Sequence, residues 1–181
     1  MACFGRGIAL AIVLSVPTSC ATPRSGGESA SAALTHFCRG VAAENRGDLE
    51  SALAAYGDAV QAGARHPTVA LARARCWLGL GELDPAYECL KEAWREASDD
   101  QRLLSILSEM SYILAPAEEA IGYSERLLLA RPSLVRPAHH LEELLTRQGR
   151  VSEVVAIFER VVASPEASGY VRRRLDALRP R

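Results

Sequence analysis

Residues 47–60 read GDLESALAAYGDAV, and residues 81–94 read GELDPAYECLKEAW. In both stretches a glycine is followed by apolar or small residues at the same offsets, which are those of one helical face. The stretches lie 34 residues apart, and the pattern returns in residues 117–128 and in residues 149–162, GRVSEVVAIFERVV. Four occurrences at one interval predict a chain built from a repeated helical unit.

An earlier apolar-patterned segment precedes each of these helices, and a turn separates the two. Gly47, Gly81 and Gly149 mark three of the turns, because glycine adopts the positive φ that ends a helix at little cost. The third unit has Ala115 and Pro116 in this place, so its turn must be built differently. No segment alternates convincingly between apolar and polar residues, and the chain after its N-terminal segment is therefore expected to be all helix.

The unit resembles the tetratricopeptide repeat, a helix-turn-helix of 34 residues. The first unit carries the resemblance best, with Gly40 in its first helix and Ala52, Tyr56 and Ala59 in its second. The resemblance implies an all-α, right-handed α-solenoid, since a single hairpin cannot bury its apolar face. Its expected units are residues 33–66, 67–100, 101–134 and 135–168. Residues 169–181 are expected to form a capping helix and an Arg-rich tail, with Arg172, Arg173 and Arg174 facing water. A contact of these arginines with anionic lipid or an acidic partner is the alternative.

The N-terminal segment is typical of an export signal. Residues 1–19 carry one early charge, Arg6, and an apolar run too short to span a bilayer. The small residues before Cys20 resemble the lipobox of bacterial lipoproteins, which implies that Cys20 is lipidated, although Pro17 departs from that pattern. Ordinary cleavage after Ala21 and an uncleaved anchor remain alternatives.

The residues that follow Cys20 extend this interpretation. Residues 20–32 are rich in Ser, Gly and Ala, a composition that predicts a flexible tether. In bacterial lipoproteins, an Asp directly after the lipidated cysteine retains the protein at the inner membrane. This chain has Ala21 there, so the resemblance implies an outer-membrane lipoprotein that faces the periplasm. A soluble periplasmic or secreted protein is the alternative.

Composition and motifs favour a non-enzymatic protein. The 21 basic and 22 acidic residues give a net charge of −1, which argues against nucleic acid as a partner. No phosphate-binding loop, metalloprotease motif or nucleophile elbow occurs, and no cofactor or metal site is expected. Cys38, Cys76 and Cys89 are interpreted as small buried hydrophobic residues on helices, with a Cys76–Cys89 bridge as an alternative. The acidic pairs, such as Glu142 with Glu143, are expected to be solvated.

The family resemblance also implies where a ligand would bind. Tetratricopeptide arrays hold a peptide or a partner helix against the first helices of successive units. The residues expected to line that groove are Phe37, Val41, Leu71, Arg75, Leu78, Ile106, Tyr112, Arg136, His139 and His140. The carboxylate clamp of chaperone-binding arrays is not expected, because Phe37 and Val41 occupy the positions of its first two residues.

The combined expectation is an adaptor that binds a protein or peptide and is tethered to a membrane by lipid. Such a protein would scaffold a cell-envelope complex or assist its assembly, in the manner of pilotins or outer-membrane assembly lipoproteins. The alternatives are a soluble peptide-binding module and an accessory subunit of an envelope enzyme.

Overall fold

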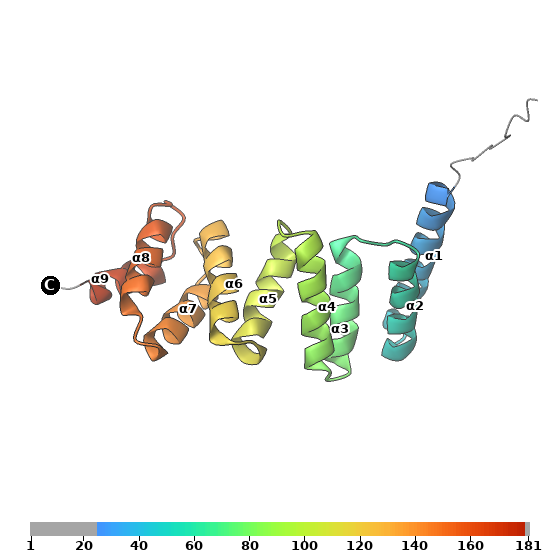
Figure 1. The fold of residues 1–181 in the computed structure, drawn as a ribbon, viewed down its shortest axis with the longest axis horizontal. Coiled ribbons are helices and arrows are strands. Elements are labelled where there is room, and N and C mark those ends of the chain that lie inside the picture. The colour runs from blue at the N-terminus through green and yellow to red at the C-terminus, as the bar shows by residue number, and fades with distance from the viewer. Residues whose placement is uncertain (1–24, 180–181) are drawn as a thin grey trace, which may run out of the picture.

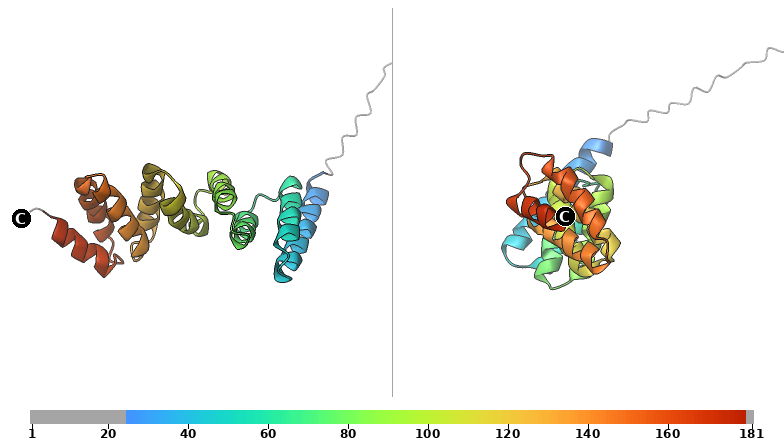
Figure 2. Two further views of the ribbon diagram at one scale, coloured as in Figure 1. Left: turned by 90° about the horizontal axis from the view of Figure 1, so that it is seen from below. Right: turned by 90° about the vertical axis from the view of Figure 1, so that its left-hand side faces the viewer.

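The computed structural model describes residues 25–179, which form helices and no strand within that range. Successive helices pair as hairpins that follow one another in an elongated row (Figure 1). Figure 2 shows the row from below and end-on, with α1 and α9 at its opposite ends. The all-α solenoid is confirmed. Its helices are α1 (Ser25–Asn45), α2 (Leu49–Gln61), α3 (Pro67–Gly79), α4 (Leu83–Glu96), α5 (Gln101–Leu114), α6 (Ala117–Ala130), α7 (Arg136–Arg147), α8 (Val151–Val162) and α9 (Gly169–Leu178).

The turns within the hairpins follow the glycine pattern. Gly47, Gly81 and Gly149 have φ values of 77°, 83° and 73°, a region that residues with a side chain rarely adopt. The hairpin of α5 and α6 differs, as its sequence requires. Ala115 is extended there, and Pro116, whose φ is fixed by its ring, leads directly into α6.

Side chains at the helix starts satisfy backbone N–H groups that have no partner within the helix. The Asp48 carboxylate accepts a hydrogen bond from the Ser51 N–H at 3.1 Å, and His66 Nδ1 accepts one from Thr68 at 3.2 Å. Asp100 accepts from the N–H groups of Arg102 and Leu103. These caps place the beginnings of α2, α3 and α5 at their observed residues.

The start of α1 differs from the sequence expectation. Residues 25–32, part of the expected flexible tether, are helical and continuous with the packed part of α1. This stretch contains no proline after Pro23, and its alanines favour a helix that is already nucleated by the residues after it. Ser29 Oγ also donates to the Ala62 carbonyl at 2.6 Å, which ties this first part of α1 to the end of α2.

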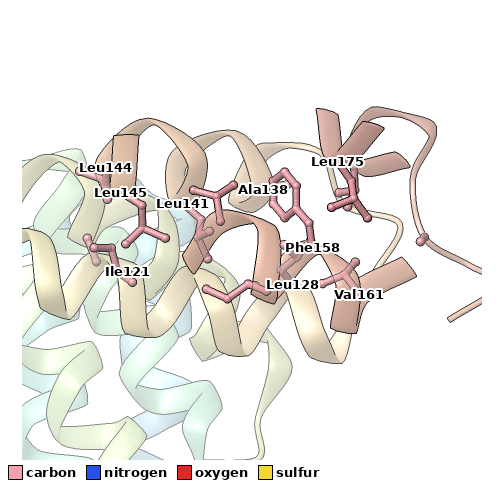
Figure 3. Packing of buried hydrophobic residues seen from close by; sticks show 14 residues of the cluster. Ile121, Leu128, Ala138, Leu141, Leu144, Leu145, Phe158, Val161 and Leu175 are labelled. Carbon is pink, nitrogen blue, oxygen red and sulfur yellow. The ribbon is translucent and has the colours of Figure 1, made fainter. Parts of the chain in front are cut away.

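Three clusters of buried side chains join the hairpins into one stack. The first lies among α1, α2 and α3, the second among α3, α4, α5 and α6, and the third among α6, α7, α8 and α9. Because each cluster includes helices of neighbouring units, every unit completes the core of the next. Figure 3 shows Phe158 of the third cluster among Leu128, Ala138 and Leu175. Its side chain is fully buried.

Two close contacts explain residues that a simple apolar pattern would not require. At Gly40 a Cβ atom would lie 2.4 Å from Cε1 of the buried Tyr56, so α1 approaches α2 only because residue 40 has no side chain. Ser124, the polar residue in the apolar pattern of α6, is buried, and its Oγ lies 3.1 Å from Ser108 Oγ of α5. The paired hydroxyls satisfy each other inside the core.

Helix α9 covers the end of the stack with Val171 and Leu175, which are buried against the third cluster. The expectation for the three arginines is correct only in part. Arg172 and Arg173 are exposed, and Arg172 donates to the carbonyls of the preceding loop. Arg174 is half-buried and pairs with Glu142 of α7, because the helix turns residue 174 toward α7.

Candidate functional site

The first helices of the units, α1, α3, α5 and α7, share one surface, which we call the A-helix face. Side chains join neighbouring helices along it: Arg75 of α3 with Glu44 of α1, and Arg136 of α7 with Glu109 of α5. The second helices, α2, α4, α6 and α8, form the B-helix face. The expected groove residues all belong to the four helices of the A-helix face.

The N-terminal half of the A-helix face is apolar. Phe37 is half-buried against Tyr56, with ring centroids 5.5 Å apart, while Val41 and Leu78 remain 36% and 39% exposed. Leu34, also of α1, is 63% exposed and lines an apolar hollow with Phe37 and the start of α3. Apolar side chains left this open can contact a ligand.

Arg75 is the exposed charge among the expected groove residues of this half. Its Nε donates to Glu44 Oε1 at 3.0 Å, and Tyr56 Oη donates to Glu44 Oε2 at 2.6 Å. The hydrogen bond from Arg75 leads the causes that hold the pKa of Glu44 below its ordinary value. Arg75 is therefore positioned by a fixed partner but stays accessible.

Leu71 is not available to a ligand, contrary to the sequence expectation. Its side chain is 8% exposed and belongs to the second core cluster, with residues of α4 and α5. Ile106 is also partly buried against this cluster. Both residues lie on the sides of their helices that pack against this cluster, so they belong to the core beneath the A-helix face and not to its open surface.

The C-terminal half of the A-helix face is polar and aromatic. Tyr112 Oη donates to Glu143 Oε2 at 2.5 Å, and Arg147 donates to the other carboxylate oxygen of the same residue. The hydrogen bond from Tyr112 leads the causes that lower the pKa of Glu143. Arg136 Nη1 lies 3.2 Å from Glu109 Oε2, and His139 is exposed beside Glu143.

His140 is buried, contrary to the sequence expectation. Its ring stacks on Tyr112, with centroids 3.9 Å apart and planes within 9° of each other. Only 9% of the residue is exposed, Nδ1 has no hydrogen-bond partner among the described residues, and desolvation lowers its pKa. Adjacent helix residues point about 100° apart. Therefore His139 faces outward while His140 packs against α5.

Glu142 is the functional candidate that sequence reasoning missed, because we expected it to be solvated. It is 8% exposed, and it accepts hydrogen bonds from Tyr170 Oη at 2.7 Å and Arg174 Nε at 2.8 Å. Desolvation, the largest influence, raises its pKa, but the bonds from Arg174 and Tyr170 together hold the pKa below its ordinary value. The repeat register could have indicated this burial, because the residues at the same position of the other three units, Gly40, Ala74 and Ser108, are all buried.

Glu142, Tyr170 and Arg174 border an open hollow between α7 and α9 of about 590 Å³. Its lining is His139, Glu142, Glu143, Thr146, Arg147, Tyr170 and Arg174. The hollow can offer hydrogen bonds and charges of both signs to a ligand. It contains no group of three or more His, Cys, Asp or Glu side chains that could hold a metal ion, and neither does the rest of residues 25–179.

The cysteines occupy different environments. Cys20, the expected lipidation site, lies outside the described residues. Cys76 and Cys89 are buried, as expected, but Cys38 is exposed, contrary to the expectation, because its side of α1 faces away from the core. All three carry free thiols. Because Cys76 and Cys89 are both free thiols, the alternative of a bridge between them is not observed, and burial raises the pKa of both. Within residues 25–179, no helix is long and apolar enough to cross a membrane.

Comparisons with known proteins agree with this geometry. Residues 45–110 match the family model described as tetratricopeptide repeat. The fold is similar to that of the crystal structure of MamA protein, at 17% identity and a TM-score of 0.59, covering 76% of this chain and 73% of that one. A tetratricopeptide repeat protein from Parabacteroides merdae matches at 16% identity and a TM-score of 0.60, over 82% of this chain and 59% of that one.

A third similar structure is the first tetratricopeptide repeat domain of Spaghetti (RPAP3), bound to the HSP90 peptide SRMEEVD. It is 19% identical, with a TM-score of 0.52, and the match covers 66% of this chain and 98% of that one. No curated protein sequence matches this chain.

Proposed function

The chain is a tetratricopeptide repeat protein, and from this premise we propose that it is a non-enzymatic adaptor. It binds a protein or peptide on its A-helix face while lipid on Cys20 tethers it to the outer membrane, facing the periplasm. Its role is to scaffold or help assemble a cell-envelope complex, as pilotin-like or outer-membrane assembly-like lipoproteins do.

The observation that carries the binding proposal is the change of character along the A-helix face. Phe37, Val41 and Leu78 leave apolar surface open in the first half, whereas Tyr112, Arg136 and His139 offer polar groups in the second. An extended or helical ligand with an apolar end and a charged end would match both halves. The peptide bound to the similar domain of Spaghetti supports a peptide as the class of ligand.

In this proposal the ligand is not the acidic C-terminus that chaperone-binding arrays hold with a carboxylate clamp. A carboxylate clamp needs cationic and amide side chains, but Phe37 and Val41 are apolar. In the second half, Arg136 and Arg147 already pair with Glu109 and Glu143. An acidic C-terminus would therefore have to displace internal partners.

The binding proposal is tested by placing a charge in the apolar half. In the full chain, Leu78→Asp should reduce recovery of crosslinked partners from native envelopes by about tenfold, because it puts a carboxylate where apolar contact is expected. Leu80→Asp is the matched control, since Leu80 is 41% exposed but lines a different hollow, with Leu53 and Trp77. Equal recovery with both variants would contradict the proposal.

The tether is tested by metabolic labelling with a fatty-acid analogue. Cys20→Ser should abolish labelling and release the chain from the membrane fraction, whereas Cys38→Ser, which changes an exposed thiol of α1, should do neither. Unlabelled wild-type protein would favour the alternative, a soluble periplasmic or secreted module or an accessory subunit of an envelope enzyme.

A further inference from the structure

A second candidate site lies on the B-helix face, between α4 and α6. Two side-chain contacts join these helices: the rings of Trp94 and Tyr123 meet edge to face, with centroids 6.5 Å apart, and Lys91 Nζ lies 3.1 Å from Glu119 Oε1. Beside them is an open hollow of about 420 Å³. This volume falls in the range of about 300–1,000 Å³ that is usual for ligand sites.

The floor of this hollow, which we call the B-face hollow, is aromatic. Trp94 is 7% exposed, so its ring is held firmly by the second core cluster, and Tyr123 packs against the same cluster. Gly122 leaves the floor open, because a Cβ atom there would meet nothing within 4 Å. Fixed aromatic rings next to an unfilled space favour contact with an aromatic side chain.

The charged side chains that line the B-face hollow leave an excess of positive charge, because its carboxylates are paired and its arginines, within the described residues, are not. Of its two carboxylates, Glu119 pairs with Lys91 and Glu118 pairs with Arg150. Arg95 and Arg126 line the hollow, and neither has an ion-pair partner among residues 25–179. Burial, followed by the Glu119 carboxylate, raises the pKa of Tyr123, while Lys91, Arg126 and Arg95 act in the opposite direction.

We propose that the B-face hollow binds an acidic segment of a protein partner in which carboxylates flank an aromatic side chain. The aromatic side chain lies on Trp94 and Tyr123, above Gly122. The carboxylates receive hydrogen bonds from Arg95 and Arg126, whose planar guanidinium groups match carboxylate geometry. This site is separate from the A-helix face, so the adaptor has two surfaces for two partners.

The test uses the full chain and a short fluorescent peptide in which one Phe is flanked by two Glu on each side, with binding followed by fluorescence anisotropy. The expected result is saturable binding that weakens as salt is added. A peptide with Lys in place of Glu should bind at least about tenfold more weakly, and so should one with Ser in place of Phe. Equal binding of all three peptides would overturn the proposal. So would tighter binding of a single-stranded oligonucleotide, which would assign the hollow to nucleic acid.

Variants of the chain locate the binding. Gly122→Leu should abolish binding by filling the hollow, and it should keep the fold, because leucine favours a helix more than glycine does. The double variant Arg95→Glu with Arg126→Glu should weaken binding at least about tenfold. Arg46→Glu, the same change in the α1–α2 turn, is the control and should bind as wild type does. Unchanged binding by Gly122→Leu would overturn the proposal even if the charge-reversed variant failed to fold.

Discussion

The close packing of α1 on α2 predicts opposite effects for the same substitution at two glycines. Gly40→Ala places a Cβ atom 2.4 Å from the Tyr56 ring, whereas Gly57→Ala, in the middle of α2, meets nothing within 4 Å. Both changes add the same methyl group to a helix. Their difference in stability therefore isolates the steric clash.

The magnitudes follow from two known terms. Alanine in place of a helical glycine stabilises by up to about 1 kcal/mol. Overpacking a core costs about 1–3 kcal/mol, and the upper part of that range applies here because Tyr56 is fully buried and cannot move aside. Gly57→Ala should therefore gain up to about 1 kcal/mol, and Gly40→Ala should lose about 1–2 kcal/mol.

The assay is urea unfolding followed by circular dichroism, combined with hydrogen exchange of the same proteins. Hydrogen exchange resolves each helix, which matters because repeat proteins can unfold from one end. Gly40→Ala should speed exchange in α1, α2 and α3 before it affects α7 and α8. Equal stabilities of the two variants, or faster exchange that begins in α8, would refute the packing of α1 on α2.

Other substitutions test the remaining packing and charge. Phe158→Ala removes a fully buried ring of the third cluster and should cost about 3–5 kcal/mol, loosening α7, α8 and α9 first; a melt unchanged from wild type would contradict that packing. The depressed pKa of Glu142 predicts stability that is complete above its ordinary value of 4.5 and is lost as the pH falls below it. Glu142→Gln should reduce this loss of stability at low pH, measured as the free energy of unfolding in urea at several pH values. The same loss in the variant and the wild type would refute the role of Arg174. Ser124→Val leaves Ser108 without its hydroxyl partner and should cost about 1–3 kcal/mol by the same unfolding assay; a gain in stability would show that this pair is dispensable.

The repeat interval predicted the architecture because the same physical requirement recurs in every unit. Each turn glycine adopts the expected positive φ, and the turn at Ala115 and Pro116 is built differently, as its sequence indicates. The start of α1 could not be predicted from composition, because Ser, Gly and Ala suit both a tether and the extension of an existing helix. The bond from Ser29 to Ala62 depends on a contact 33 residues away.

The predicted groove residues all lie on α1, α3, α5 and α7, and the errors in their predicted exposure have one cause. Helical periodicity predicts which side of each first helix lines the groove. It does not predict how far the next unit covers that side, which depends on the packing of the units. Leu71 and His140 lie on the covered edge and are buried, while Val41, Arg75 and His139 remain exposed. Glu142 shows that the repeat register is a better guide to burial than residue type.

The proposal that the A-helix face is the docking surface is tested most directly by site-specific photocrosslinking in living cells. A photoreactive residue at Leu78 of the full chain should form adducts with a discrete protein in the membrane fraction. The same residue at the exposed Ala156 of α8, on the B-helix face, should not form those adducts. Identical adducts from both positions, or adducts from Ala156 alone, would contradict a docking surface formed by α1, α3, α5 and α7.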